Sequence, residues 1–176
     1  DANINDLSFA STFVFNSSNF DIVTEPTLIV SNDINETCDI VLLPYIIESD
    51  RKTLKDYLNY LCTDNMTFKS TIVLSHNDIA GINYGSFISK VGFDVEDILD
   101  NCDLFINGHL HNCGYVDSQE KILNIGNLSG LNFSENAFIH RHYCAILDTK
   151  TLELQFFENP YAFNFYKINT TKNALD

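Results

Sequence analysis

The chain has 176 residues, a length that suits one domain with a hydrophobic core of its own. Its 10 basic and 24 acidic side chains give a formal net charge of −14, which excludes a nucleic-acid binder that relies on a basic surface. An enzyme that handles phosphates through bound divalent cations is still compatible with this charge, because the cations then dominate the local field.

In the first half of the chain, short apolar runs and one amphipathic segment predict alternating strands and helices. Residues 20–30 are typical of two short strands, and residues 38–46 of a buried strand. Residues 50–62 carry apolar side chains at helical spacing, which predicts a helix that Asp50 caps. Residues 69–76 then return to a buried strand.

The second half continues this order and then turns to hairpins. We expect a short helix over residues 94–102 and a strand that runs into a turn over residues 103–112. Residues 114–130 and 140–158 each predict a pair of antiparallel strands, and the polar tail 160–176 is expected to fray. Together these elements predict a mixed α/β layered fold without an internal repeat or an interdomain linker.

The cysteines and the apolar runs bear on the compartment. Five cysteines occur without a Cys-x-x-Cys pair, which indicates free thiols in a reducing cytoplasm. No apolar run reaches the roughly 18 residues of a membrane span, and no basic leader precedes an apolar segment. We therefore expect a cytoplasmic protein with no membrane partner.

All five histidines lie at or after residue 76. His76 ends one predicted strand, and His109 and His111 follow the next one. Because ligands gather at the carboxyl edge of open α/β sheets, these three imidazoles can converge on a metal ion. The alternative is that a His-x-His pair has arisen by chance. The second pair, His140 and His142, lies on a strand-like run and is interpreted as surface or cross-strand packing outside the site.

Four segments in this order resemble the second half of the calcineurin-like metallophosphoesterases: "TIVLSH", "CDLFINGHLH", "KILNIGNLSGLNFSEN" and "HYCAILDTKTLELQFF". The branch that they are most similar to contains the SbcD-type subunit of double-strand-break repair nucleases and the phage recombination endonuclease subunit. The resemblance covers roughly residues 20–160. It implies part of a layered metallophosphoesterase β-sandwich flanked by helices, with residues 1–176 forming a single partial domain and residues 160–176 a tail.

The resemblance also implies a site and a reaction. His76 and His109 match ligands of one metal, and His111 matches a ligand of the other. Two divalent cations, expected to be manganese although imidazole suits several metals, would polarise a phosphodiester for attack by water. Gly108 is expected to let the backbone turn sharply before the pair. The implied partners are a DNA substrate, an SbcC-type ATPase subunit and a second copy of the full-length protein.

The chain departs from this pattern in its first half, which contains neither Asp-x-His nor Gly-Asp-x-x-Asp. These motifs would supply the bridging carboxylate, and Asp1 is either the last residue of a Gly-Asn-His-Asp motif or an ordinary loop acid. We therefore expect a C-terminal fragment that is inactive alone and that exposes an apolar face near residues 40–44 and 71–75.

Two alternatives to a nuclease remain open. One is another phosphatase or phosphodiesterase of the same superfamily, and the other is a non-catalytic binding module on the same fold. The loop at residues 124–136, with its acid at Glu135, favours the nuclease branch.

Overall fold

A computed structural model of the chain describes residues 22–29, 38–61, 70–83, 88–133 and 135–168. In chain order the elements are β1 (Thr27–Ile29), β2 (Cys38–Leu43), the 3₁₀ helix η2 (Glu48–Asp50), α2 (Leu54–Leu61), β3 (Ser70–Ser75), α3 (Val95–Asn101), β4 (Leu104–Asn107), β5 (Gly114–Tyr115), β6 (Ile122–Asn124), β7 (Tyr143–Leu147) and β8 (Leu154–Glu158). The predicted α/β class with a mixed sheet is confirmed.

The main sheet has six strands in the order β1-β2-β3-β4-β6-β5. Strands β2, β3, β4 and β6 run parallel, and β1 and β5 pair antiparallel at the two edges. The register aligns Leu43 with Ser75, Ser75 with Asn107, and Asn107 with Asn124. The four parallel strands therefore end at one level, and the loops that follow them lie along a single edge of the sheet.

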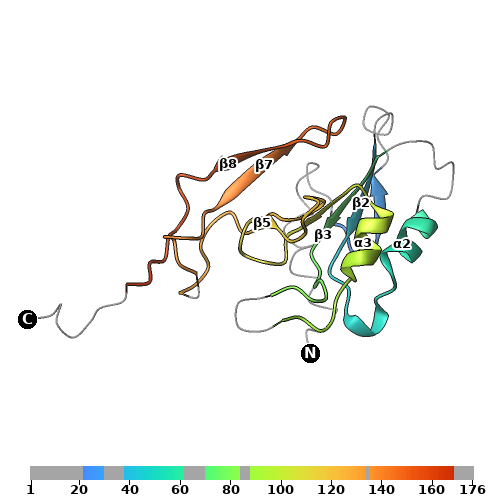
Figure 1. The fold of residues 1–176 in the computed structure, drawn as a ribbon, viewed down its shortest axis with the longest axis horizontal. Coiled ribbons are helices and arrows are strands. Elements are labelled where there is room, and N and C mark those ends of the chain that lie inside the picture. Colours follow the sequence, from blue (N-terminus) through green and yellow to red (C-terminus); the bar gives the residue numbers. More distant parts are fainter. Residues whose placement is uncertain (1–21, 30–37, 62–69, 84–87, 134, 169–176) are drawn as a thin grey trace, which may run out of the picture.

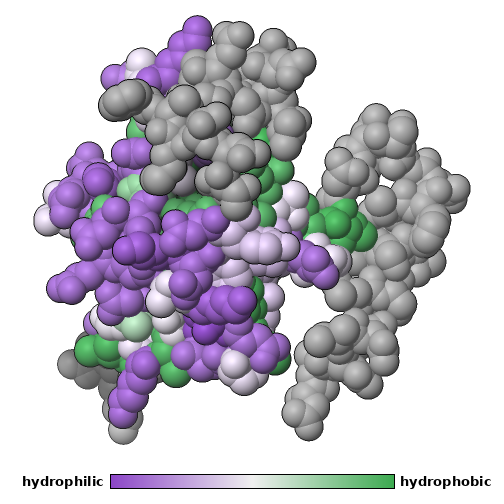
Figure 2. Space-filling view, turned by 90° about the vertical axis from the view of Figure 1, so that its right-hand side faces the viewer, coloured by the Kyte–Doolittle hydropathy of each residue, from purple (hydrophilic) through white to green (hydrophobic). Residues whose placement is uncertain are grey.

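Helices α2 and α3 cover one face of this sheet (Figure 1). Side chains alternate along a strand, so Val41 and Leu43 point to the helices while Ile40 points to the opposite face. Buried Leu54 of α2 and Ile98 of α3 complete this side of the core. Seen from the side of the helices, the described surface is mostly hydrophilic (Figure 2), as expected where amphipathic helices face water.

The opposite face of the sheet packs against one end of the β7–β8 hairpin. Ile40, Ile72 and Leu104 are at most 8% exposed and contact a cluster that includes Leu147 and Leu154 of the hairpin. The prediction of an exposed apolar face near residues 40–44 and 71–75 is therefore wrong in its location, because the helices and the hairpin cover these strands.

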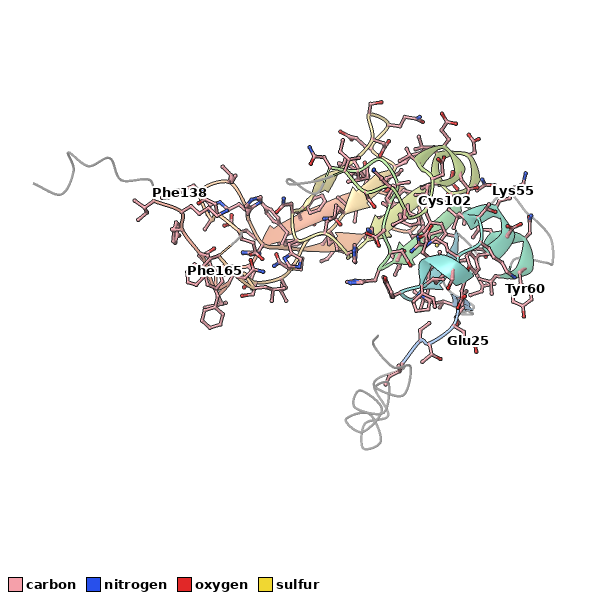
Figure 3. All side chains as sticks on the ribbon, turned by 90° about the horizontal axis from the view of Figure 1, so that it is seen from below. Glu25, Lys55, Tyr60, Cys102, Phe138 and Phe165 are labelled. Atoms are coloured by element: carbon pink, nitrogen blue, oxygen red, sulfur yellow. The ribbon has the colours of Figure 1, made fainter. Side chains whose placement is uncertain are left out.

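The exposed apolar side chains gather instead at the outer part of the hairpin and in the segments beside it. Phe138 and Phe165 lie at the end of the molecule farthest from Cys102 and Lys55, as Figure 3 shows. Most of the exposed large apolar side chains belong to this region: Leu128, Leu131, Phe133, Phe138, Ile139, Ile146, Phe156, Phe157, Tyr161, Phe163, Tyr166 and Ile168.

The start of α2 differs from the prediction. Asp50 belongs to η2, and the cap is formed by Thr53, whose Oγ1 accepts a hydrogen bond from the backbone N–H of Asp56 at 3.1 Å. The Asp56 carboxylate accepts in return from the backbone N–H of Thr53 at 3.3 Å, which completes a reciprocal capping box. Asp97 of α3 accepts from the backbone N–H of Leu54 and ties the two helices together.

Two further predictions need correction at the ends of the chain. Within residues 20–30 the described part forms one strand, β1, and residues 22–26 are not paired in a sheet. The described part of the tail does not fray, since the backbone N–H of Gly130 donates to Phe163 O and that of Ala137 donates to Phe165 O. Residues 169–176 lie outside the described part.

The four cysteines of the described part, at 38, 102, 113 and 144, are free thiols, while Cys62 lies outside it. Burial raises the pKa of the Cys102 thiol to about 12, so this group stays protonated and unreactive. A search of the described residues finds no helix that is long and apolar enough to cross a membrane.

A fully buried asparagine joins the loops that follow β2 and β3. Asn77 accepts a hydrogen bond from the backbone N–H of Ile46 at 2.8 Å and donates to Pro44 O at 2.9 Å and to Ser75 Oγ at 3.0 Å. Each amide atom of this side chain thus has a partner. Burying an amide is tolerated only under this condition.

We expect Asn77→Ala to lower the free energy of unfolding by about 2 kcal/mol or more, because each buried backbone group left without a partner costs about 1–3 kcal/mol. Urea denaturation measures the change. Asn59→Ala, on the exposed side of α2, is the matched control and should stay within about 0.5 kcal/mol of the parent chain. Equal stability of the two variants would contradict this role of Asn77.

Candidate metal centre

The three predicted ligands lie at the ends of two neighbouring strands. His76 follows β3 directly, and His109 and His111 lie in the turn after β4, which pairs with β3. The ring centroids of His76 and His109 are 5.2 Å apart, with the two ring planes perpendicular. Parallel pairing in this register therefore brings together imidazoles that are distant in sequence, as the strand-end argument predicts.

Two more buried asparagines hold the loops that carry these histidines. Asn107 Oδ1 accepts from the backbone N–H of Asn77 at 3.0 Å, and Asn107 Nδ2 donates to Asn77 O at 2.9 Å. Asn124 accepts from the backbone N–H of Leu110 at 3.1 Å and donates to Leu110 O at 2.8 Å and to Asn112 O. The His109–His111 turn is thus fixed from β6.

Gly108 has a different role from the one predicted. Its φ is not in the left-handed region, so the turn itself does not demand glycine. A Cβ built on Gly108 would lie 3.3 Å from His76 Nδ1. The absent side chain therefore makes room for the His76 ring beside the turn.

Desolvation and like-charge repulsion both favour the neutral form of His76. The pKa of His76 lies below its ordinary value, first because partial burial disfavours the charged form and then because His109 and His111 repel a proton on it. Although the side chain is exposed, this shift favours the neutral ring, which offers a nitrogen lone pair. A neutral imidazole is the form that binds a metal.

Carboxylates lie beside the other two histidines. Asp78 Oδ1 is 3.3 Å from His109 Nε2, and Glu135 Oε1 is 3.0 Å from His111 Nδ1. The sequence motifs did not point to Asp78, and they indicated Glu135 only as the acidic residue in the loop at residues 124–136. The Tyr45 ring lies stacked beside His109, with ring centroids 6.3 Å apart.

His140 and His142, interpreted as packing residues, lie closer to the candidate ligands than a cross-strand position implies. Both precede β7 rather than lying in it, and His140 lines the same cavity as His109 and His111. His142 is only 4% exposed, and its Nε2 is 4.0 Å from Glu135 Oε2. The strand periodicity assumed for residues 140–142 does not apply, because the chain enters its strand only at Tyr143.

A cavity of about 600 Å³ opens beside the pair and is lined by His109, His111, Glu135 and His140 among others. His76 does not line this cavity, whereas His109 and His111 do. Among the residues that the structure describes, no three His, Cys, Asp or Glu side chains form a group placed to hold a metal ion. Asp1 lies outside the described residues. The ligand roles therefore stay predictions.

No protein-family model matches this chain, and no curated protein matches it in sequence.

Gly126 packs closely against the backbone of the His109–His111 turn, so a substitution at Gly126 tests the position of that turn. Its φ is +76°, and an added Cβ would lie 2.8 Å from both Cys113 N and His111 O. Gly81 has a similar φ of +82° but nothing within 4 Å of an added Cβ, so Gly81→Ala reproduces the backbone strain without the clash.

Both Gly126→Ala and Gly81→Ala should lose about 1–2 kcal/mol of stability, since an alanine in the left-handed region is strained. Gly126→Ala should lose more, and it alone should shift the NMR signals of the His111 ring. Urea denaturation and ring-selective NMR of the two variants make the comparison. Unchanged His111 signals in Gly126→Ala would contradict the placement of this turn against residue 126.

Proposed function

We propose that this chain is the C-terminal part of a two-metal phosphodiesterase of the calcineurin-like type, most similar to the nuclease subunits of DNA repair and phage recombination. The observation that carries the proposal is the juxtaposition of His76 and His109 at the ends of β3 and β4, with His111 in the same turn. The metallophosphoesterase layering of the whole domain is part of this proposal.

The donor atoms near the strand ends are of the types that divalent transition cations prefer. His76, His109 and His111 would contribute neutral nitrogens, and Asp78 lies beside His109 as a carboxylate. Bound dications would supply charge that polarises a phosphodiester and activates water. The chain's own residues would hold the ligand rings in place, through the hydrogen bonds of Asn107 and Asn124 to the strand-end loops.

The net charge of −14 supports a mechanism in which bound cations are needed for the chain to bind a phosphate substrate. An acidic chain repels the phosphates of DNA unless bound cations reverse the field at the site. Manganese as the metal, DNA as the substrate, an SbcC-type ATPase partner and a homodimer of the full-length protein are proposed from the sequence resemblance. A phosphatase, another phosphodiesterase or a non-catalytic module on this fold would give different outcomes in the two tests below.

The first test is metal binding by the 176-residue chain. Manganese should bind weakly, because the motifs that supply the remaining ligands are absent from the sequence. Loss of a group that only orients a metal ligand commonly weakens metal binding about tenfold or more. His109→Ala removes a proposed ligand itself, so it should weaken manganese binding by more than about tenfold. Isothermal titration calorimetry measures this, with His140→Ala as the matched control in the same cavity. Equal affinity of both variants and the parent chain would contradict the ligand role.

The second test is nuclease activity. The 176-residue chain alone should not cleave DNA at an enzymatic rate, because positioning and electrostatics supply most of the acceleration and the bridging carboxylate is absent. A longer chain that also carries Asp-x-His and Gly-Asp-x-x-Asp motifs should cleave DNA with manganese. His111→Ala should then lower its rate by about 100-fold or more. Chelator-sensitive cleavage by the 176-residue chain alone would contradict the proposal.

A further inference from the structure

A buried carboxylate lies between two imidazoles behind the His109–His111 turn. Glu135 is 5% exposed, its Oε1 is 3.0 Å from His111 Nδ1, and its Oε2 is 4.0 Å from His142 Nε2. Two further donors reach Oε1: Asn127 Nδ2 at 3.2 Å and the backbone N–H of Leu131 at 3.2 Å. A carboxylate costs several kcal/mol to bury unless such donors compensate it.

This carboxylate determines which nitrogen of His111 carries the proton. An ionised carboxylate only accepts hydrogen bonds, so Nδ1 of His111 at 3.0 Å must donate. In a neutral imidazole the other nitrogen, Nε2, then holds a lone pair. Since the Nδ1 side of the ring faces buried Glu135, Nε2 lies on the side turned away from it, and His111 lines the cavity.

Asn127 and His142 fix Glu135 from behind. His142 Nδ1 lies 2.9 Å from Asn127 Oδ1 and 3.2 Å from Asn127 O, two acceptors, so this nitrogen is a donor. The Asn127 amide therefore turns its oxygen to His142 and its nitrogen to Glu135, and both ends of the amide are satisfied. The hydrogen bonds that join His142 Nδ1 to Asn127, Asn127 Nδ2 to Glu135 and His111 Nδ1 to Glu135 are consistent in their donors and acceptors, whereas His142 Nε2, at 4.0 Å from Oε2, forms no hydrogen bond with the carboxylate.

We infer that Glu135 is a positioning residue that holds the proton of His111 on Nδ1 and so reserves Nε2 for a divalent cation. The second half of this inference rests on the proposed function, whereas the first half concerns the metal-free protein. Carboxylates that accept from the second nitrogen of a ligating histidine fix its tautomer and ring orientation and raise its basicity. His142 and Asn127 support Glu135 and do not ligate.

The first experiment determines the tautomer of His111 in the metal-free chain. Ring ¹⁵N and ¹H correlation spectra at about pH 8, above the ordinary histidine pKa of about 6.5, distinguish a protonated Nδ1 from a protonated Nε2. The signals are assigned by their absence in His111→Gln. The parent chain should show His111 protonated on Nδ1. Protonation on Nε2 would overturn the inference, and this measurement on the parent chain does not depend on any variant folding.

The second experiment removes the charge of Glu135. In Glu135→Gln the negative charge that favours a proton on Nδ1 is removed, so the share of His111 protonated on Nδ1 should fall below that of the parent chain. Glu153→Gln is the matched control, because Glu153 is exposed on the hairpin, and its His111 signals should equal those of the parent. An unchanged tautomer in folded Glu135→Gln would also overturn the inference.

Manganese titration of the same proteins separates the inference from the proposed function. Glu135→Gln should weaken manganese binding by about 10–100-fold, and Glu153→Gln should not. If the parent chain binds no manganese but His111 is protonated on Nδ1, the proposed function fails and the assignment of Glu135 as the group that fixes the tautomer stands. If manganese binds equally to Glu135→Gln and to the parent, the positioning role is overturned while the metal site stands.

Discussion

Buried asparagine side chains at the carboxyl edge of the sheet hold the loops that carry the candidate ligands. Asn77, Asn107 and Asn124 are at most 2% exposed, and each bonds to the backbone of a neighbouring loop. A buried amide without partners is costly, whereas each satisfied bond contributes about 1 kcal/mol. The loops are therefore restricted to the few arrangements in which all three amides are satisfied, and the histidines are placed as a consequence.

The parallel sheet supplies the second condition for the site. Because β3 and β4 are neighbours in register, a side chain placed just after one strand lies beside the side chains that follow the other. Neither His76 nor His109 belongs to the hydrophobic core, so the core does not dictate their identity. The proposed metal site depends on these imidazoles serving as ligands rather than as packing residues.

Periodicity and strand-end positions predicted much of the architecture. The apolar runs that became β2, β3 and β4 are short and continuous, as buried parallel strands are. The signal for α3 was equally local, since Asp94 caps the helix directly before its first turn. Strand runs and helix caps depend on residues close together in the chain, so the sequence alone predicts them.

The parts that sequence reasoning missed depend on contacts distant along the chain. Glu135 lies 24 residues from His111 in a loop without periodicity, so no spacing rule links the two. The burial of His142 depends on where Asn127 lies in the folded chain. Likewise, the close approach of the His76 ring explains Gly108 better than turn geometry does, and only the folded chain shows this approach. The acid in the "NFSEN" loop was the one local sign of this network.

The proposed function requires that divalent cations bind at the strand-end histidines rather than at the exposed carboxylates of this acidic chain. The competing location is the acidic groove beside the hairpin, which Glu120, Asp148 and Glu153 help to line. Substoichiometric manganese, added to the ¹⁵N-labelled chain, broadens NMR signals of groups close to the ion. The account predicts that ring signals of His76, His109 and His111 broaden first, before the backbone signals of Glu120, Asp148 and Glu153. Broadening that begins at those acidic residues, with the histidine rings unaffected, would contradict it.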